Sequence, residues 1–328
     1  MNELQDSHGR RFKYLRLSVT DICNFRCSYC LPNGYQINPK QNDGELNTGE
    51  IHNLVTAVAA LGVTKVRLTG GEPTLRQDLA EIASGIAAVP GIRKLALSTN
   101  GHSLKRNAAA YRRAGISAVN ISLDSLKEGS FREITGSNRH KEILEGVDAA
   151  LDAGFDIVKT NAVLMRGLND GELPMFLDWA KNRPISFRFI ELMQTGAIGE
   201  MFMQRHIRAN FIHSTLIRSG WVPNPRQIDD GPALEYSHKD YKGRIGIIAP
   251  YSEHFCQTCN RLRVSSRGRL QLCLFGAGDL SLRPWLASEE QCRDLQRVIC
   301  ESLTSKLPRH RLHEADAGQT ENLSMIGG

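Results

Sequence analysis

The sequence has no run of 18 or more uncharged apolar residues among its 328 positions, so we expect no membrane-spanning helix. Its first residues also lack the apolar stretch of a secretory signal, which predicts a cytoplasmic protein whose cysteines stay reduced. Internal repeats and low-complexity tracts are missing too. With 41% apolar residues, the chain can bury the core of one large α/β domain or of two smaller ones.

Blocks of like charge are missing as well. The 41 Lys and Arg residues are interspersed with 35 Asp and Glu residues, which leaves a net charge of +6. Such a mild positive balance fits a polyanionic small molecule as well as a nucleic acid, so charge alone does not identify the ligand. The phosphate-binding sequence Gly-x₄-Gly-Lys-Ser/Thr is absent, which argues against a conventional GTPase.

Cysteine is present in an unusual pattern of two triplets. Cys23, Cys27 and Cys30 fall within eight residues, and no fourth cysteine lies nearby. Three thiolates are one ligand short of a closed zinc site or of an ordinary four-cysteine iron–sulfur site. The residues alone leave open a zinc site with a remote fourth ligand or three unrelated cysteines, whereas a disulfide would leave one thiol over. We expect Cys292 and Cys300 to be small buried residues of a C-terminal helix over 288–307.

The first two thirds of the sequence alternate short β-rich runs with helical patterns. This rhythm predicts a parallel sheet covered by helices, in six βα units rather than the eight of a full barrel. The fold class is thus an α/β protein, an incomplete (β/α)₆ triosephosphate-isomerase-like barrel. Predicted strands are 14–19, 65–69, 94–98, 118–122, 157–163 and 186–191. Predicted helices are 49–61, 78–89, 103–114, 141–153 and 171–181.

After about residue 195 the pattern changes to longer polar segments interrupted by proline and glycine. We therefore predict a partial barrel over 1–195 and a C-terminal α+β extension over 196–316, which carries the second cysteine triplet. Hairpin-like runs are expected at 233–237, 244–248 and 262–273. Residues 317–328 read as a flexible tail that ends in two glycines.

The Cys-x₃-Cys-x₂-Cys spacing of the first triplet resembles the signature of the radical S-adenosylmethionine superfamily. That resemblance implies a three-cysteine 4Fe-4S cluster whose fourth iron chelates S-adenosylmethionine. Tyr29 stands where the superfamily has an aromatic residue near the adenine. The run Gly70-Gly71-Glu72-Pro73 matches its Gly-Gly-Glu motif, which binds the methionine amino group. Ser122 and Met193, at the ends of the fourth and sixth predicted strands, match further S-adenosylmethionine contacts.

The second triplet, Cys256, Cys259 and Cys273, has x₂ and x₁₃ spacing. By spacing alone a zinc ribbon is an equal rival, with His254 or His238 as a fourth ligand. Two arginines follow the pair directly, however, and a structural zinc site has no need of them. With these arginines the whole chain resembles the GTP 3′,8-cyclase family of the superfamily. The resemblance implies a second 4Fe-4S cluster whose free iron holds the guanine of GTP.

The same resemblance implies the remaining site residues and partners. A hydrogen atom would be removed from C3′ of GTP, and C3′ would then bond to C8, which gives 3′,8-cyclo-7,8-dihydro-GTP, the first step of molybdenum cofactor biosynthesis. The terminal Gly327 and Gly328 would reach into the active site. Partners would be an electron donor such as flavodoxin or ferredoxin and the next enzyme, cyclic pyranopterin monophosphate synthase, with no nucleic acid and no membrane; a homodimer stays open. The implied GTP ligands are Arg16, Arg67, Ser98, Thr99, Lys159, Arg188, Arg261 and Arg263.

Two other functions fit parts of the pattern. The chain could be a radical enzyme that modifies a peptide and uses its second cluster as an electron carrier. It could also be a zinc-stabilised nucleic-acid-binding module, for which the positive balance is a weak argument. Binding of GTP would distinguish a nucleotide cyclase from the peptide-modifying enzyme. Iron content would distinguish it from the zinc-stabilised module.

Overall fold

The computed structural model describes residues 3–37, 44–226, 230–276, 280–318 and 323–324. Six parallel strands form the centre of its sheet, each close to the bounds that the sequence predicts. The parallel strands are β1 (Tyr14–Ser18), β2 (Lys65–Thr69), β3 (Lys94–Thr99), β4 (Ala118–Ser122), β5 (Ile157–Leu164) and β6 (Ser186–Glu191). The helices between them are α1 (Thr48–Ala60), α2 (Leu79–Ala87), α3 (Leu104–Arg113), α4 (Glu128–Thr135), α5 (His140–Asp152) and α6 (Leu173–Lys181).

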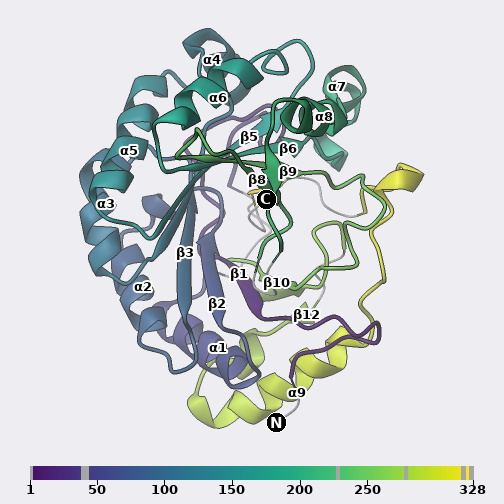
Figure 1. Ribbon diagram of the computed structural model, residues 1–328. Helices are drawn as coiled ribbons and strands as arrows, with labels where there is room; N and C mark the ends of the chain where they lie inside the picture. Colours follow the sequence, from purple (N-terminus) through teal and green to yellow (C-terminus); the bar gives the residue numbers. More distant parts are fainter. Residues whose placement is uncertain (1–2, 38–43, 227–229, 277–279, 319–322, 325–328) are drawn as a thin grey trace.

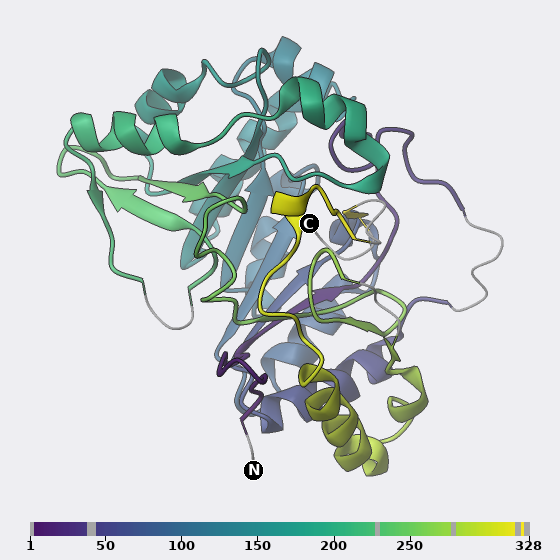
Figure 2. The same cartoon turned by 90° about the vertical axis from the view of Figure 1, so that its right-hand side faces the viewer.

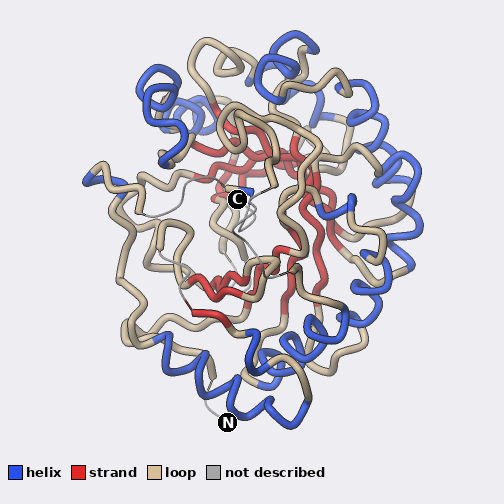
Figure 3. The backbone as a smooth tube through the Cα atoms, turned by 180° about the vertical axis from the view of Figure 1, so that it is seen from behind, coloured by secondary structure: helices blue, strands red, loops and turns tan. Residues whose placement is uncertain are grey.

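The helices cover the outer face of the curved sheet, and the strands line its inner side (Figures 1 and 3). Within the described residues, twelve strands run in the order β12-β11-β10-β1-β2-β3-β4-β5-β6-β9-β8-β7, a row with two ends rather than a closed ring. The predicted incomplete barrel is therefore confirmed. Helix α4 was not among the predicted helices, because its eight residues follow the fourth strand within a loop-like polar stretch.

The C-terminal region extends this sheet at both ends, which the sequence did not predict. Its hairpins are present, but β9 also pairs in parallel with β6, and β10 pairs in parallel with β1. Strands here are β7 (Val222–Pro223), β8 (Leu234–Ser237), β9 (Arg244–Ile248), β10 (Arg261–Val264), β11 (Arg269–Gln271) and β12 (Leu280–Ser281). Helices here are α7 (Gly199–Arg205), α8 (Asn210–Arg218) and α9 (Cys292–Leu303), with short 3₁₀ turns at Gly196–Ile198, Arg283–Trp285, Glu289–Gln291 and Leu312–Glu314. One further 3₁₀ turn, Pro73–Leu75, follows β2.

Local chemistry explains where several of these elements begin. Asn47 and Glu50 form a reciprocal capping box at the start of α1, which satisfies two otherwise unpaired backbone N–H groups. Helix α9 packs against α1 (Figure 2). Gln296 of α9 donates a hydrogen bond to the carbonyl of Ala57. This contact fixes the C-terminal region to the first βα unit.

The main core lies between the sheet and its helices, and it is built from alternate strand residues. Leu15 and Leu17 of β1 and Val66 and Leu68 of β2 are at most 1% exposed. Because successive strand residues point to opposite faces, the residues between them point to the inner side of the sheet. Those intervening residues include the candidate ligands described next.

Candidate active site

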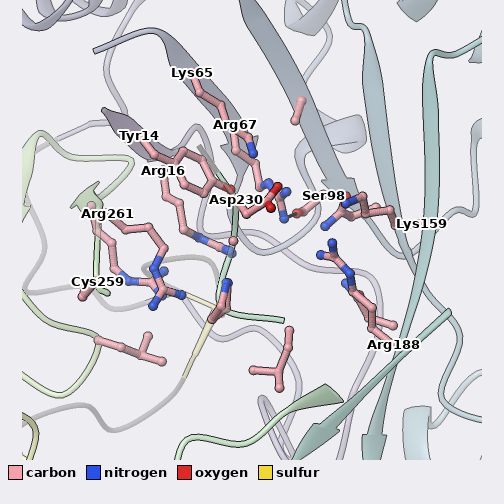
Figure 4. Close-up of a pocket in the computed structure, with 18 of the residues that line it drawn as sticks. Tyr14, Arg16, Lys65, Arg67, Ser98, Lys159, Arg188, Asp230, Cys259 and Arg261 are labelled. Atoms are coloured by element: carbon pink, nitrogen blue, oxygen red, sulfur yellow. Dashed lines mark hydrogen bonds between the residues drawn. The ribbon is translucent and has the colours of Figure 1, made fainter. Parts of the chain in front are cut away.

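The inner side of the sheet encloses a cavity of about 330 Å³. It is bordered by both central and C-terminal strands, and the side chains labelled in Figure 4 point into one shared space. Among the described residues, the lining includes Arg16, Arg67, Ser98, Lys159, Arg188, Met193, Arg261, Arg263 and all three cysteines of the second triplet.

Strand register explains how residues so far apart in sequence meet there. Arg263 pairs with Arg16, and Arg16 pairs with Arg67, across three adjacent parallel strands. On the other side of the cavity, Asn161 of β5 pairs with Arg188 of β6. Since paired residues in a sheet point to the same face, each row presents its polar groups together.

Burial and crowding of like charges characterise this inner face. Burial and the neighbouring Arg263 lower the pKa of Arg16 well below its usual value, and burial together with Arg261 lowers the pKa of Arg263 to about 10. With a pKa of about 10, Arg263 remains protonated at neutral pH. The amide of Asn120, oriented by its hydrogen bonds, accepts from Arg67 Nη1 at 2.5 Å. Buried guanidiniums in such numbers favour an anionic ligand, because charge removed from water needs a counter-charge.

Tyr14 is a cavity residue that sequence reasoning missed. Its ring lies under the Lys65 ammonium, 4.7 Å from the ring centroid, and under the Arg67 guanidinium. Burial raises the pKa of its hydroxyl, but Arg67, Arg16 and Lys65 outweigh this effect and lower that pKa to about 8. The sequence did contain a clue to this role, because Tyr14 lies two residues before Arg16 and therefore on the same face of a predicted strand.

The second triplet borders this cationic cavity. The thiols of Cys256, Cys259 and Cys273 lie within electrostatic reach of one another. Burial raises the pKa of Cys259, but the positive charges of Arg261 and Lys306 dominate and lower that pKa to about 7. A partly ionised thiol among cations is a competent ligand for iron or zinc, so the donor chemistry fits a metal cluster.

The first triplet occupies the loop after β1, outside the lining of the cavity. Its backbone is held against the end of α4, where Ser28 N–H donates to the carbonyl of Ile134 at 2.8 Å. Burial raises the pKa of Cys23 to about 11 and that of Cys30 to about 12. Electrostatic coupling joins both thiols to Cys27, so the three also form one potential cluster site.

Tyr29 lies between the second and third of these cysteines. Its hydroxyl donates a hydrogen bond to the buried carboxylate of Asp124 at 3.0 Å. Val163 N–H donates to the same carboxylate, whose pKa burial raises to about 6. Asp124 thus connects the cluster loop to the ends of β4 and β5, and no sequence motif had marked it.

The Gly-Gly-Glu turn packs directly on the loop that carries the first triplet. Gly71 N–H donates to the Thr20 carbonyl at 2.8 Å, and Glu72 N–H donates to the Ile22 carbonyl at 2.7 Å. A Cβ on Gly71 would overlap the backbone of Ile22, so only glycine allows this approach. The Glu72 carboxylate is 1% exposed and accepts hydrogen bonds from Thr74, Thr99 and Asn100.

The structure places only some of the other predicted site residues at the cavity. Ser98 lines the cavity, 3.4 Å from Arg67 Nη1, whereas the Thr99 hydroxyl donates to Glu72. Ser122 is half-buried at the end of β4 and is not part of the cavity lining. The double glycine Gly327 and Gly328 lies outside the described residues. In the described part of the chain, no three His, Cys, Asp or Glu side chains are placed to hold a single metal ion, and no helix has the length and apolar character needed to cross a bilayer.

Comparison with known proteins agrees with this division of the site. Residues 17–180 match the Radical SAM superfamily, and residues 185–312 match the Molybdenum Cofactor Synthesis C family. The Streptococcus suis protein SuiB, in its crystal structure bound to S-adenosylmethionine, has the same fold with a TM-score of 0.59 and 13% identity. That likeness covers 80% of this chain and 60% of SuiB. Fold and cysteine loop thus define a radical SAM protein.

Full-length relatives specify the family further. A GTP 3′,8-cyclase from Pectobacterium atrosepticum is 49% identical over 328 residues, which is 100% of both chains. A GTP 3′,8-cyclase from Klebsiella pneumoniae subsp. pneumoniae is 48% identical over 327 residues, covering 100% of this chain and 99% of the relative. The chain belongs to the GTP 3′,8-cyclase family of the radical SAM superfamily.

Proposed function

We propose that the protein converts GTP to 3′,8-cyclo-7,8-dihydro-GTP, the first step of molybdenum cofactor biosynthesis. One observation carries this proposal: a single cavity joins a cysteine triplet to a row of buried arginines on adjacent strands. A triphosphate matches these guanidiniums in charge and in hydrogen-bonding geometry, and the bordering thiols supply a cluster site for the base. The 48–49% identity to proteins named GTP 3′,8-cyclase supports the same substrate.

Each part of the chain has a proposed task. Residues 1–195 hold a 4Fe-4S cluster through Cys23, Cys27 and Cys30, and residues 196–316 hold a second one through Cys256, Cys259 and Cys273. When bound, the first cluster and S-adenosylmethionine would supply the 5′-deoxyadenosyl radical that removes hydrogen from the substrate. S-adenosylmethionine would contact Tyr29, Gly71, Glu72, Ser122 and Met193.

The chain's own residues bind and orient the nucleotide in this proposal. Arg67 is held by Asn120 and lies beside Ser98, so its fork is oriented before substrate arrives. Arg16 and Arg263 face the same space and would neutralise phosphate charge. Thr99 would act through Glu72, to which its hydroxyl donates. The terminal glycines Gly327 and Gly328 are proposed to complete the site.

Partners and setting follow from this chemistry. We propose a reducing, cytoplasmic setting, in which the cysteines remain thiolates able to ligate iron. A small electron-transfer protein such as flavodoxin or ferredoxin would reduce the first cluster. The cyclic product would pass to cyclic pyranopterin monophosphate synthase.

Anaerobic turnover tests the proposal. Protein reconstituted with iron and sulfide should contain about eight irons per chain, as two 4Fe-4S clusters require. With reductant, S-adenosylmethionine and GTP, it should form 5′-deoxyadenosine in step with loss of GTP. Fully loaded protein that forms neither product would refute the proposed function, and a colourless zinc protein would support the nucleic-acid-binding alternative.

A further inference from the structure

Glu235 places a carboxylate beside two cations of the inner face, Arg188 and Lys159. One of its oxygens, Oε1, accepts hydrogen bonds from Arg188 Nε at 3.1 Å and from Ser186 Oγ at 3.1 Å. The same oxygen pairs with Arg188 Nη2 and with Lys159 Nζ, the latter at 3.3 Å. The carboxylate thus joins two of the proposed triphosphate ligands, although no motif marks it.

The contact crosses a strand. Glu235 lies on β8, Arg188 lies on β6, and β9 runs between them. Gly246 of β9 pairs with Glu235 on one side and with Arg188 on the other. A Cβ on Gly246 would lie 2.8 Å from Arg188 Cγ. The arginine therefore reaches Glu235 through space that only a glycine leaves open.

Electrostatic interactions, in addition to packing, connect Glu235 with Arg188 and Lys159. Lys159 faces Arg67 from β2, Arg188 from β6 and Glu235 from β8. Burial, together with the charge of Arg188, lowers the pKa of Lys159 to about 8, and Glu235 opposes this shift. Burial raises the pKa of Glu235, but Arg188 and Lys159 dominate and lower it to about 2, so Glu235 is ionised at neutral pH. Without its charge, two mutually repelling cations would lose their shared partner.

We propose that Glu235 is a positioning residue that holds Arg188 and Lys159 in the orientation in which they bind the substrate triphosphate, with Gly246 providing the passage. The proposal rests on the proposed function. Both side chains have many rotamers, and ordering such a side chain on binding costs conformational entropy, so an orientation set before binding favours affinity. Glu235 acts through these two cations rather than on the reacting atoms.

The test uses anaerobic holoenzyme with both clusters and compares wild type, Glu235→Gln, Glu235→Asp and Gly246→Ala. Steady-state kcat and KM for GTP are measured from pH 6.5 to 9. Glu301→Gln is the matched control, because Glu301 is an exposed carboxylate on α9 outside the cavity. Iron content and S-adenosylmethionine cleavage without GTP verify that each variant is folded and loaded.

Glu235→Gln should raise KM for GTP at pH 8 by about 10-fold or more, the effect of a lost hydrogen bond to a charged group, with kcat changed far less. Its kcat/KM should also start to fall at a lower pH than in wild type, because Lys159 loses the charge that raises its pKa. Glu235→Asp should restore the wild-type pH midpoint. Gly246→Ala displaces Arg188 but keeps the carboxylate, so it should raise KM for GTP. It should not move the midpoint to lower pH, because Glu235 stays in place and Arg188, whose charge lowers the pKa of Lys159, is moved away.

Three results would overturn the proposal. One is equal loss of kcat and kcat/KM in Glu235→Gln at an unchanged pH midpoint, which marks a purely structural residue. Another is wild-type behaviour of that variant. The third is tighter GTP binding, which would make the carboxylate a competitor of the triphosphate. Failure of the loaded wild type to bind or convert GTP is a different result, because it rejects the proposed function itself.

Discussion

The two cysteine triplets differ in their electrostatic surroundings. Around the first, burial dominates and the nearest charges are acidic, so the pKa of Cys23 rises to about 11. Around the second, burial raises the pKa of Cys256, but at Cys259 the charges of Arg261 and Lys306 outweigh burial and lower the pKa to about 7. Only the second triplet borders the arginine-lined cavity. The difference fits the proposal that the first site generates the radical and the second holds an anionic substrate.

Removing each triplet in turn should give the largest effects. Replacement of Cys23, Cys27 and Cys30 by alanine should abolish 5′-deoxyadenosine formation, because no other described thiols take their place after β1. Replacement of Cys256, Cys259 and Cys273 should abolish GTP conversion but leave slow S-adenosylmethionine cleavage. Chromatography of 5′-deoxyadenosine and of the product formed from GTP measures the two activities separately. Equal loss of both products in the two variants would contradict the division of tasks.

Gly71→Ala should damage the first site and spare the second. The added Cβ meets the backbone of Ile22, which cannot move without displacing the cysteine loop. We expect loss of most S-adenosylmethionine cleavage, while the second triplet still binds about four irons. Gly85→Ala is the matched control, because a Cβ there meets no atom within 4 Å. An active Gly71→Ala variant would show that the turn tolerates a side chain.

Arg67→Ala should weaken GTP binding and leave the first cysteine site unaffected. The variant loses a guanidinium that contacts Ser98 and Asn120 at the cavity, so KM for GTP should rise by about 10- to 100-fold, as for a hydrogen bond to a charged group. S-adenosylmethionine cleavage without GTP should stay unchanged. Arg297→Ala, which removes an exposed pair with Asp294 on α9 outside the cavity, provides the control. An unchanged KM would remove Arg67 from the proposed GTP site.

The smallest expected effect is on pH dependence. Lys159 has a pKa lowered to about 8, and only its protonated form attracts phosphate, so kcat/KM for GTP should fall about tenfold per pH unit above pH 8. Lys159→Arg should flatten this fall, because a guanidinium remains protonated throughout the range. Parallel profiles for the two proteins would show that another group controls the pH response.

Much of the fold could be predicted because its signals are local. The six parallel strands alternate with helices, and each is a short apolar run ending in polar or small residues. The positions of β9 and β10 could not be predicted in the same way. Their pairing with β6 and β1 depends on contacts between residues up to 247 positions apart, such as Tyr14 with Arg261, for which no local pattern exists.

The candidate site was predictable to a similar degree. Cysteine spacing and basic residues on strands are visible in the sequence, and the structure places Arg16, Arg67, Lys159 and Arg188 around one cavity. Glu235 and Asp124 were missed, because an isolated acidic residue carries no signal until its partners are known. Thr99 was grouped with Ser98, but adjacent strand residues point to opposite faces, and its hydroxyl binds Glu72 instead.

The most direct test is spectroscopic and uses single-cluster proteins. A variant with Cys23, Cys27 and Cys30 replaced by alanine keeps only the second triplet, and its counterpart keeps only the first. We predict that GTP changes the electron paramagnetic resonance spectrum of the reduced second cluster and that S-adenosylmethionine changes only that of the first. A GTP-induced change at the first cluster, with none at the second, would contradict the assignment of the arginine-lined cavity to the substrate.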